Sequence, residues 1–251
     1  MKSLEVLFTP ADFDALKSRS LDNALCVVFD VFRATSSMIT ALANGAAAVI
    51  PVGEISEALA IRKSESGVLL AGERDGVRIR AALTDGVDFD LGNSPREFTR
   101  EKVSGKTIVT TTTNGTRALR SCAHAKTVLA GSFLNLDATA GEIRNLNPEN
   151  LIVICSGTFD ETALEDVLGA GALCDLLWKH FQDAKISDSA IIARKIFQPA
   201  ENDLLKAASE SRNGRRLLGN PDLRDDVAFC LQRNIFQFAA SLRKDGKVLK
   251  L

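Results

Sequence analysis

The sequence of 251 residues contains no tyrosine, one tryptophan and two histidines, His124 and His180. Both histidines fall near the ends of predicted helices. A Ser–His or Cys–His pair would instead need one of them beside a nucleophile in a polar loop after a strand. We therefore expect both histidines to be structural, so any catalysis depends on carboxylates, arginines, lysines, hydroxyls, asparagines and a metal ion.

The five cysteines are an odd number, and none of them stands in a C-x-x-C spacing. This pattern predicts neither a disulfide framework nor a zinc site. Cys26, Cys155 and Cys174 lie in apolar runs, where an unpaired cysteine behaves as a small hydrophobic residue. We expect free thiols in the core and a reducing compartment, the cytoplasm.

An excess of either charge is also missing, because 31 Lys and Arg residues face 32 Asp and Glu residues. This balance disfavours nucleic acid or an anionic membrane as the main partner. No apolar run is long enough to span a bilayer, and residues 1–8 are too polar for a signal peptide. The composition is that of an ordinary globular enzyme, and we expect a single domain over residues 1–251.

Apolar runs alternate with helical patterns through the first half of the chain. We predict strands over residues 4–7, 24–29, 47–52, 68–71, 107–109, 127–130, 151–155 and 247–251. We predict helices over 34–43, 55–63, 136–146, 163–181, 190–197, 204–218 and 225–232, with a further helix start at Ser94-Pro95. Alternation of this kind predicts crossover helices between parallel strands. The two terminal strands lack this context, so the expected fold is α/β, a three-layer α/β/α sandwich with a mixed, largely parallel sheet.

The stretch from Thr110 to Arg117 connects an apolar strand to a helix through four threonines, an asparagine and a glycine. Free backbone N–H groups and the positive end of a helix dipole form an anion site at such a junction. Gly115 lets the backbone come close to a ligand, and Arg117 adds a planar charged fork that suits phosphate or carboxylate. The stretch fits an ordinary strand and capped helix equally well.

Polar residues follow other predicted strands in the same way. Asp30 and Arg33 follow one strand, Glu73 and Arg74 follow another, and the polar stretch 156–166 follows a third. Because ligands bind beyond the carboxyl ends of strands in an open α/β sheet, we expect these groups on one rim. An acid beside an anionic ligand needs a bridging cation, and Mg²⁺ prefers carboxylate, water and phosphate oxygens.

Each acid on this rim also has a structural explanation. Asp30 fits a helix cap, and Glu73 fits a surface ion pair in a turn flanked by glycines. Glu165 and Asp166 open a long predicted helix, where acids suit the helix dipole without any function. The glycines of 169–171 lie inside that helix and predict close helix packing rather than a phosphate loop.

Several segments, taken in order, resemble the 2-phosphosulfolactate phosphatase family. The resemblance rests on residues 30–35, 72–74, 89–95 and 112–116, and then on 165–166, 169–171, 213–215 and 225–226. It covers nearly the whole chain. It implies a three-layer α/β/α fold and Mg²⁺-dependent hydrolysis of the phosphate ester of 2-phospho-3-sulfolactate, a step toward coenzyme M.

The resemblance and the rim together give the candidate site residues. The candidate catalytic residues are Asp30, as base or nucleophile, with Arg33, Glu73 and Arg74. The candidate substrate-binding residues are Thr35, Asn93, Ser94, Thr112, Thr113, Asn114, Gly115, Thr116 and Arg117. The candidate Mg²⁺ ligands are Asp30, Glu73, Glu165 and Asp166. Direct attack by water and a phospho-enzyme both stay open, and so does a homo-oligomer.

One departure from the family lies at residues 80–87, which look inserted before the segment that begins at Phe89. Because this change falls beside the expected pocket, the physiological substrate stays open. One alternative function is a phosphatase acting on another phosphorylated 2-hydroxy acid. The other is a non-catalytic protein that binds anions similar to sulfolactate.

Overall fold

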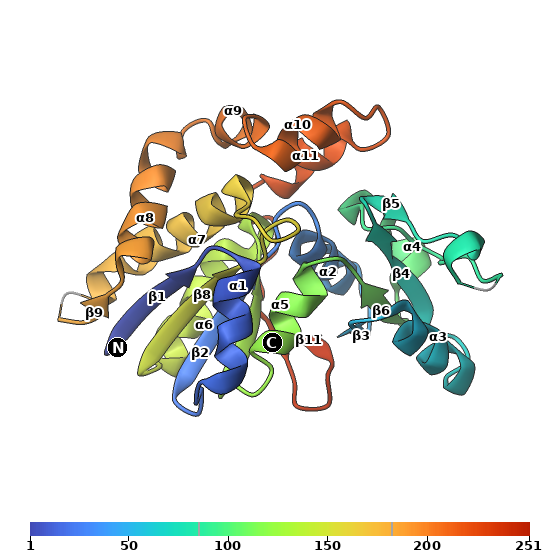
Figure 1. The fold of residues 1–251 in the computed structure, drawn as a ribbon, viewed down its shortest axis with the longest axis horizontal. Helices are drawn as coiled ribbons and strands as arrows, with labels where there is room; N and C mark the ends of the chain where they lie inside the picture. The colour runs from blue at the N-terminus through green and yellow to red at the C-terminus, as the bar shows by residue number, and fades with distance from the viewer. Residues whose placement is uncertain (85, 182) are drawn as a thin grey trace.

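A computed structural model describes residues 1–84, 86–181 and 183–251 (Figure 1). The strands are β1 (Ser3–Leu7), β2 (Ala24–Phe29), β3 (Ala48–Pro51), β4 (Leu69–Arg74), β5 (Val77–Arg78), β6 (Thr107–Thr111), β7 (Thr127–Gly131), β8 (Asn150–Cys155), β9 (Lys185–Ile186), β10 (Ala240–Leu242) and β11 (Val248–Lys250). The helices are α1 (Pro10–Asp14), α2 (Ala34–Ala43), α3 (Ile55–Ser64), α4 (Arg100–Val103), α5 (Gly115–Ser121), α6 (Leu136–Leu146), α7 (Leu164–Leu177), α8 (Asp188–Ala200), α9 (Leu204–Ser209), α10 (Arg212–Leu218) and α11 (Arg224–Cys230).

Within the described residues the strands form one sheet in the order β5-β4-β6-β3-β11-β10-β7-β2-β8-β1-β9. Most neighbouring strands are parallel, and every antiparallel pair contains β5, β10 or β11. Helices cover both faces of the sheet (Figure 1). The predicted α/β fold with a mixed, largely parallel sheet is confirmed.

The side chains of β2 show how the core is divided, because successive residues of a strand point to opposite faces. Leu25, Val27 and Phe29 pack on one face with residues of α6, α7 and α8. Cys26 and Val28 pack on the other face with residues of α1, α2 and α5. The whole of β2 is buried, as its uninterrupted apolar sequence predicts.

The hairpin of β10 and β11 lies between two groups of parallel strands. β10 pairs with β7 over three residues, and β11 meets β3 at the single pair Val248–Val49. A strand near the C-terminus is therefore confirmed, whereas β10 was not predicted. The hairpin joins the group β4-β6-β3 to the group β7-β2-β8-β1.

Several predicted helix boundaries are wrong. The helix predicted over 163–181 ends at Leu177 and continues only as a 3-10 turn. The helix predicted over 204–218 is two helices, because the Ser211 hydroxyl accepts a hydrogen bond from the Gly214 N–H and starts α10. Ser94 and Pro95 begin a 3-10 turn of three residues rather than an α-helix.

The remaining expectations concern the glycines of α7, the inserted segment and the membrane. A Cβ at Gly171 would lie 2.2 Å from the Ala193 carbonyl oxygen of α8, so the predicted close helix packing is confirmed. The segment 80–87 contains a 3-10 turn at Ala81–Leu83, and its residue 85 lies outside the described residues. Among helices in the described parts of the chain, none combines the length and apolarity needed to cross a bilayer.

Candidate active site

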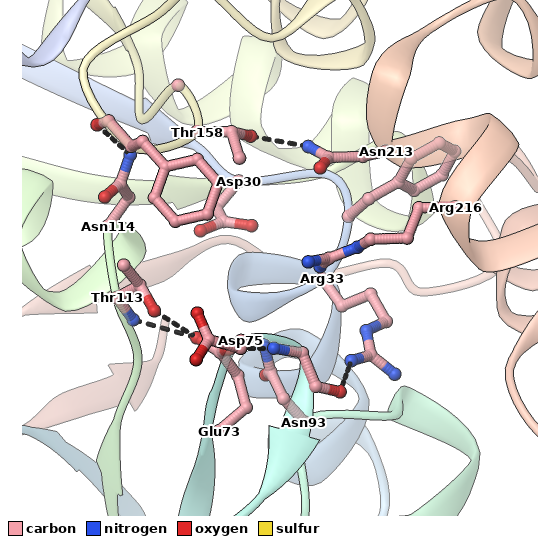
Figure 2. Close-up of a pocket in the computed structure, with 14 residues that line it drawn as sticks. Asp30, Arg33, Glu73, Asp75, Asn93, Thr113, Asn114, Thr158, Asn213 and Arg216 are labelled. Atoms are coloured by element: carbon pink, nitrogen blue, oxygen red, sulfur yellow. Dashed lines mark hydrogen bonds between the residues drawn. The ribbon is translucent and has the colours of Figure 1, made fainter.

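An open cleft lies at the carboxyl ends of β2, β4, β6 and β8 (Figure 2). It is lined by Asp30, Phe32, Arg33, Glu73, Asp75, Gly76, Asn93, Thr113, Asn114, Gly157, Thr158, Phe159, Asn213 and Arg216. Six of these residues belong to the candidate set drawn from the sequence. The expectation that strand ends gather the polar groups on one rim is therefore confirmed for five of them, and the sixth, Asn93, entered the candidate set through the family resemblance.

Gly115 allows the start of α5 to lie close to the start of α2. A Cβ at this position would lie 2.5 Å from Asp30 Oδ2 and 2.6 Å from Ala34 Cβ, so no larger residue fits. The starts of α2 and α5 therefore touch, although β2 and β6, which precede them, are not neighbours in the sheet. The close approach that Gly115 permits in the structure is to the Asp30 carboxylate, and the predicted approach to a ligand stays a prediction.

Asp30 is both a helix cap and a cleft residue. Its Oδ1 accepts a hydrogen bond of 3.0 Å from the Ala34 N–H at the start of α2, and its side chain lies in the cleft (Figure 2). Burial raises the pKa of Asp30 to about 6, against the lowering effect of the Ala34 hydrogen bond and with a further rise from the negative charge of Glu73. A carboxyl group with this pKa exchanges protons readily near neutral pH.

Glu73 is the residue before the last of β4, and both of its carboxylate oxygens accept hydrogen bonds. Oε1 accepts hydrogen bonds from the Thr113 N–H at 2.9 Å and the Thr113 hydroxyl at 3.0 Å. Oε2 accepts one from the Gly76 N–H at 2.6 Å. Hydrogen bonds to a carboxylate are short and strong, so three donors fix its position in the cleft.

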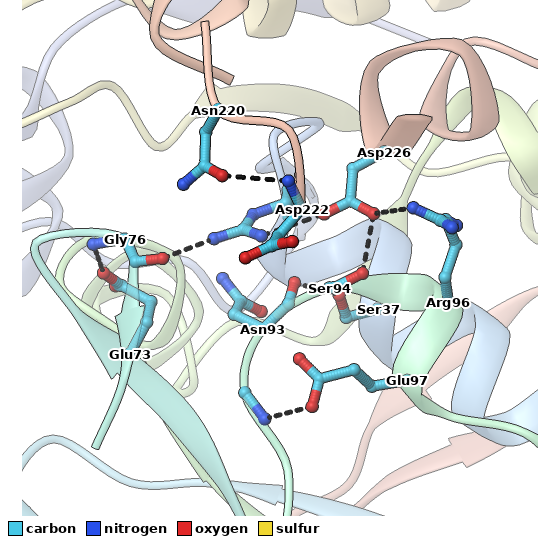
Figure 3. A network of polar contacts seen from close by, with 12 residues as sticks. Ser37, Glu73, Gly76, Asn93, Ser94, Arg96, Glu97, Asn220, Asp222 and Asp226 are labelled. Carbon is cyan, nitrogen blue, oxygen red and sulfur yellow. Dashed lines mark hydrogen bonds and ion pairs between the residues drawn. The ribbon is translucent and has the colours of Figure 1, made fainter. Parts of the chain in front are cut away.

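Arg33 is buried, with a side-chain exposure of 3%. It belongs to a polar network that includes Asp226 and Gly76, both labelled in Figure 3. Its Nη1 lies 2.9 Å from Asp226 Oδ2, and its Nη2 donates to the Gly76 carbonyl at 2.9 Å. The Ser94 hydroxyl donates to the other oxygen of Asp226 at 2.6 Å. The charge of Arg33 is therefore balanced within the protein, and the guanidinium holds the turn that begins after Glu73.

The α10 helix supplies two further cleft residues, Asn213 and Arg216. The Asn213 amide donates to Glu165 Oε1 at 2.5 Å and to the Thr158 hydroxyl at 2.6 Å. Arg216 is exposed, lines the cleft and forms no ion pair with any described residue. Neither residue was in the candidate set, although the sequence 213–215 contributed to the family resemblance.

The acids Glu165 and Asp166 lie behind the cleft wall. Asp166 accepts hydrogen bonds from the N–H groups of Val31 at 2.8 Å and Gly157 at 3.1 Å, and so ties two cleft loops together. Burial, followed by the nearby charges of Asp30 and Glu165, raises the pKa of Asp166 well above its ordinary value. Glu165 is 1% exposed, and its Oε2 has no hydrogen-bond partner among the described residues.

Other candidates lie outside the cleft lining. Arg117 pairs with Asp14 and lies 3.6 Å from Asp160. Arg74 donates to its neighbour's carbonyl and to the Thr111 hydroxyl at 3.0 Å. The candidates Thr35, Ser94, Thr112 and Thr116 are buried and hydrogen-bonded to nearby protein groups. These side chains support the walls of the cleft.

Phe159, Thr158 and Gly157 are cleft residues that the sequence indicated only as part of a polar stretch after β8. The Asn114 amide donates to the carbonyls of Ser156 at 3.1 Å and Phe159 at 2.9 Å. Asn114 therefore holds this loop instead of capping α5 with its side chain. No pattern in the sequence indicates that Phe159 is exposed at the cleft.

The fold and the cleft together define an α/β protein with a polar cleft at the carboxyl ends of a largely parallel sheet, the usual place of a ligand site in this class. The sequence model described as 2-phosphosulpholactate phosphatase matches residues 12–245. The chain belongs to this family, and it is a phosphoric monoester hydrolase that acts on a small phosphorylated substrate. The resemblance drawn from the motifs is confirmed.

Three relatives illustrate the similarity, each named a probable 2-phosphosulfolactate phosphatase. The protein of Thermotoga petrophila is 39% identical over 89% of this chain and 91% of its own length. That of Caldanaerobacter subterraneus is 39% identical over 94% and 95%, respectively. That of Caldicellulosiruptor saccharolyticus is 36% identical over 89% and 90%.

Proposed function

We propose that this enzyme hydrolyses the phosphate ester of 2-phospho-3-sulfolactate to sulfolactate and inorganic phosphate, with Mg²⁺ as its cofactor. The names of the relatives support this substrate. The observation that carries the chemistry is a single cleft that holds the carboxylates of Asp30 and Glu73 beside Arg216. Family membership favours this phosphatase over a non-catalytic anion-binding protein.

Asp30 is the residue we place at the reacting phosphoryl group. Its carboxyl group lies in the cleft with a pKa of about 6, so near neutral pH it can accept a proton from water or attack the phosphorus itself. Both routes need Asp30 in its charged form at the moment of attack. Glu73, fixed by Thr113 and Gly76, supplies a second charge of constant orientation.

The donor set of the cleft fits Mg²⁺, which is usually held by one or two carboxylates together with waters and substrate phosphate oxygens. Asp30 and Glu73, which both line the cleft, would hold it, whereas the other two candidate ligands, Glu165 and Asp166, lie behind the cleft wall and outside the lining. Among the described residues, no group of three or more His, Cys, Asp or Glu side chains is arranged for a metal. A bound Mg²⁺ would offset the negative charge of the phosphoryl oxygens.

Phosphate release from a panel of phosphorylated 2-hydroxy acids tests this proposal, with the enzyme first stripped by a chelator and then given Mg²⁺. We expect 2-phospho-3-sulfolactate to have the highest kcat/KM and release to depend on added Mg²⁺. A clear preference for another ester would contradict the substrate. Full activity in the stripped enzyme would contradict the cofactor.

The five cysteines are free and buried, which agrees with the reducing cytoplasm that we propose as the compartment.

A further inference from the structure

The proposed substrate carries a carboxylate and a sulfonate besides its phosphate, and the cleft contains two arginines. Arg33 is not available to them, because Asp226 balances its charge and the Gly76 carbonyl takes a second hydrogen bond from its guanidinium. Its exposure of 3% also leaves almost no surface for a ligand. The cationic group that remains is Arg216.

Arg216 reaches the cleft from α10, on the same helix face as Asn213, three residues earlier. Figure 2 shows its side chain extending into the cleft from the side opposite Asn114. A Cβ at Gly76 would lie 2.7 Å from Arg216 Nη2, and Gly76 has a φ of +78°. Glycine is thus required at this turn for its backbone, and its lack of a side chain leaves room for the guanidinium.

The neighbouring arginines of α10 are occupied by protein groups. Arg212 forms an ion pair with Glu161 and donates to the Thr158 carbonyl, and Arg215 donates to the Glu210 carbonyl. Arg216 forms no ion pair with any residue that the structure describes. A guanidinium that points into a polar cleft and forms no ion pair with the carboxylates of its lining is suited to an anionic group of a ligand.

We infer that Arg216 is a specificity-determining residue, which binds one of the two acidic groups of the substrate that do not react. This inference rests on the proposed function. The phosphoryl group lies at Asp30, and the guanidinium fork receives the carboxylate or the sulfonate. Arg216 therefore selects phosphate esters that carry a second acidic group over those that do not.

The test compares Arg216→Ala and Arg216→Lys with Arg215→Ala, a matched control on the same helix that lies outside the cleft lining. The full substrate is compared with 2-phospholactate, which lacks the sulfonate, and with 2-phosphooxyethanesulfonate, which lacks the carboxylate. Both truncated esters are measured as competitors, so that each gives a Ki even if it is not hydrolysed. Thermal unfolding of every variant verifies that it is folded.

We expect Arg216→Ala to raise KM for the full substrate by about 10- to 100-fold, with kcat changed less than about threefold. Arg216→Lys retains the charge and recovers part of the loss, whereas Arg215→Ala is unchanged. The Ki of the ester that lacks the bound group stays constant, and this identifies the carboxylate or the sulfonate. The Ki of the truncated ester that retains the bound group rises together with the KM of the full substrate.

An equal rise of both Ki values would overturn the inference, because Arg216 would then contact the phosphoryl group. An unchanged KM in Arg216→Ala would overturn it as well. If the unmodified enzyme prefers another phosphorylated 2-hydroxy acid, the proposed function fails separately. The same comparison is then made with that ester and with its analogue lacking the second acidic group.

Discussion

At the scale of single residues, Asp30 combines a structural contact with a chemical role in the cleft. One carboxylate oxygen caps α2 through the Ala34 N–H, while the carboxyl group remains in the cleft. The capping and catalytic interpretations of this residue are therefore compatible. Burial of its charge destabilises the folded protein, because the pKa of about 6 lies above the ordinary value of 3.8.

We predict opposite effects of Asp30→Asn on activity and on stability. Asparagine can still cap α2, but it carries no charge, so it cannot act as base or nucleophile and is a weaker metal ligand than a carboxylate. The kcat value should therefore fall by about 10²–10⁴-fold or more. Loss of the buried charge should raise the free energy of unfolding above pH 6, by at most about 3 kcal/mol. Steady-state kinetics and denaturant unfolding of one preparation measure both.

The sign of the pH dependence follows from the raised pKa of Asp30. The folded protein holds this proton more tightly than the unfolded chain, so the stabilisation by Asp30 is complete below pH 3.8 and is lost as pH rises through about 6. The stability difference between Asp30→Asn and the unmodified protein should therefore grow from pH 4 to pH 8. Near-normal turnover in a folded variant would remove Asp30 from the catalytic residues.

At the scale of elements, the turn between β4 and β5 is fixed by residues from distant parts of the chain. Asp226 of α11 pairs with Arg33, which donates to the Gly76 carbonyl, and the Gly76 N–H donates to Glu73. Asp226 therefore acts on the cleft as a positioning residue, without lining it. This chain of hydrogen bonds begins at Asp226 on α11 and ends at Glu73 on β4.

We predict that Asp226→Asn costs about 3–5 kcal/mol of stability, because it leaves the buried charge of Arg33 without a partner. The kcat value should fall as well, since the turn that holds Glu73 loses its anchor. Asp225→Asn is a matched control, because the Asp225 side chain is 64% exposed and pairs with Arg96 at 3.3 Å. This exposed pair should contribute less than about 1 kcal/mol.

Urea unfolding of Asp226→Asn and Asp225→Asn measures this difference. The double variant Arg33→Met with Asp226→Leu should recover part of the lost stability without recovering activity, since it replaces the pair by apolar side chains. Equal stability of the two single variants would show that the Arg33–Asp226 pair does not hold the turn.

At the scale of the whole molecule, the cleft gathers residues from both groups of strands and from α10, while both histidines lie outside its lining. His124 Nε2 lies 3.2 Å from the Arg19 carbonyl, and His180 belongs to the 3-10 turn after α7. The chemistry of the cleft is therefore assigned to carboxylates and arginines.

We predict that His124→Ala and His180→Ala each retain turnover within about twofold of the unmodified enzyme. Loss of a general acid or base usually lowers the rate by about 10²–10⁴-fold. Measurement of kcat at saturating substrate and Mg²⁺ distinguishes these outcomes. A loss of that size in either variant, with the fold intact, would require a histidine in the mechanism.

Local sequence signals predicted the buried strand β2, the helix α2 and the rim that holds Asp30, Glu73 and Thr113. These follow from apolar runs, caps and the rule that strand ends gather at one edge. The sequence did not predict which rim residues face the cleft, since this depends on tertiary pairing. Arg33 meets Asp226, 193 residues later in the chain, whereas Arg117 turns away toward Asp14.

The hairpin of β10 and β11 also has a consequence for how the chain reaches this fold. Residues 240–250 pair with β7 and β3, which are made more than a hundred residues earlier. Contacts of such sequence separation form slowly. Until they form, β3 is paired only with β6 and β7 only with β2, so each has one open edge on which another chain can add a strand. On the ribosome, both edges therefore stay open to aggregation until residues 240–250 have emerged.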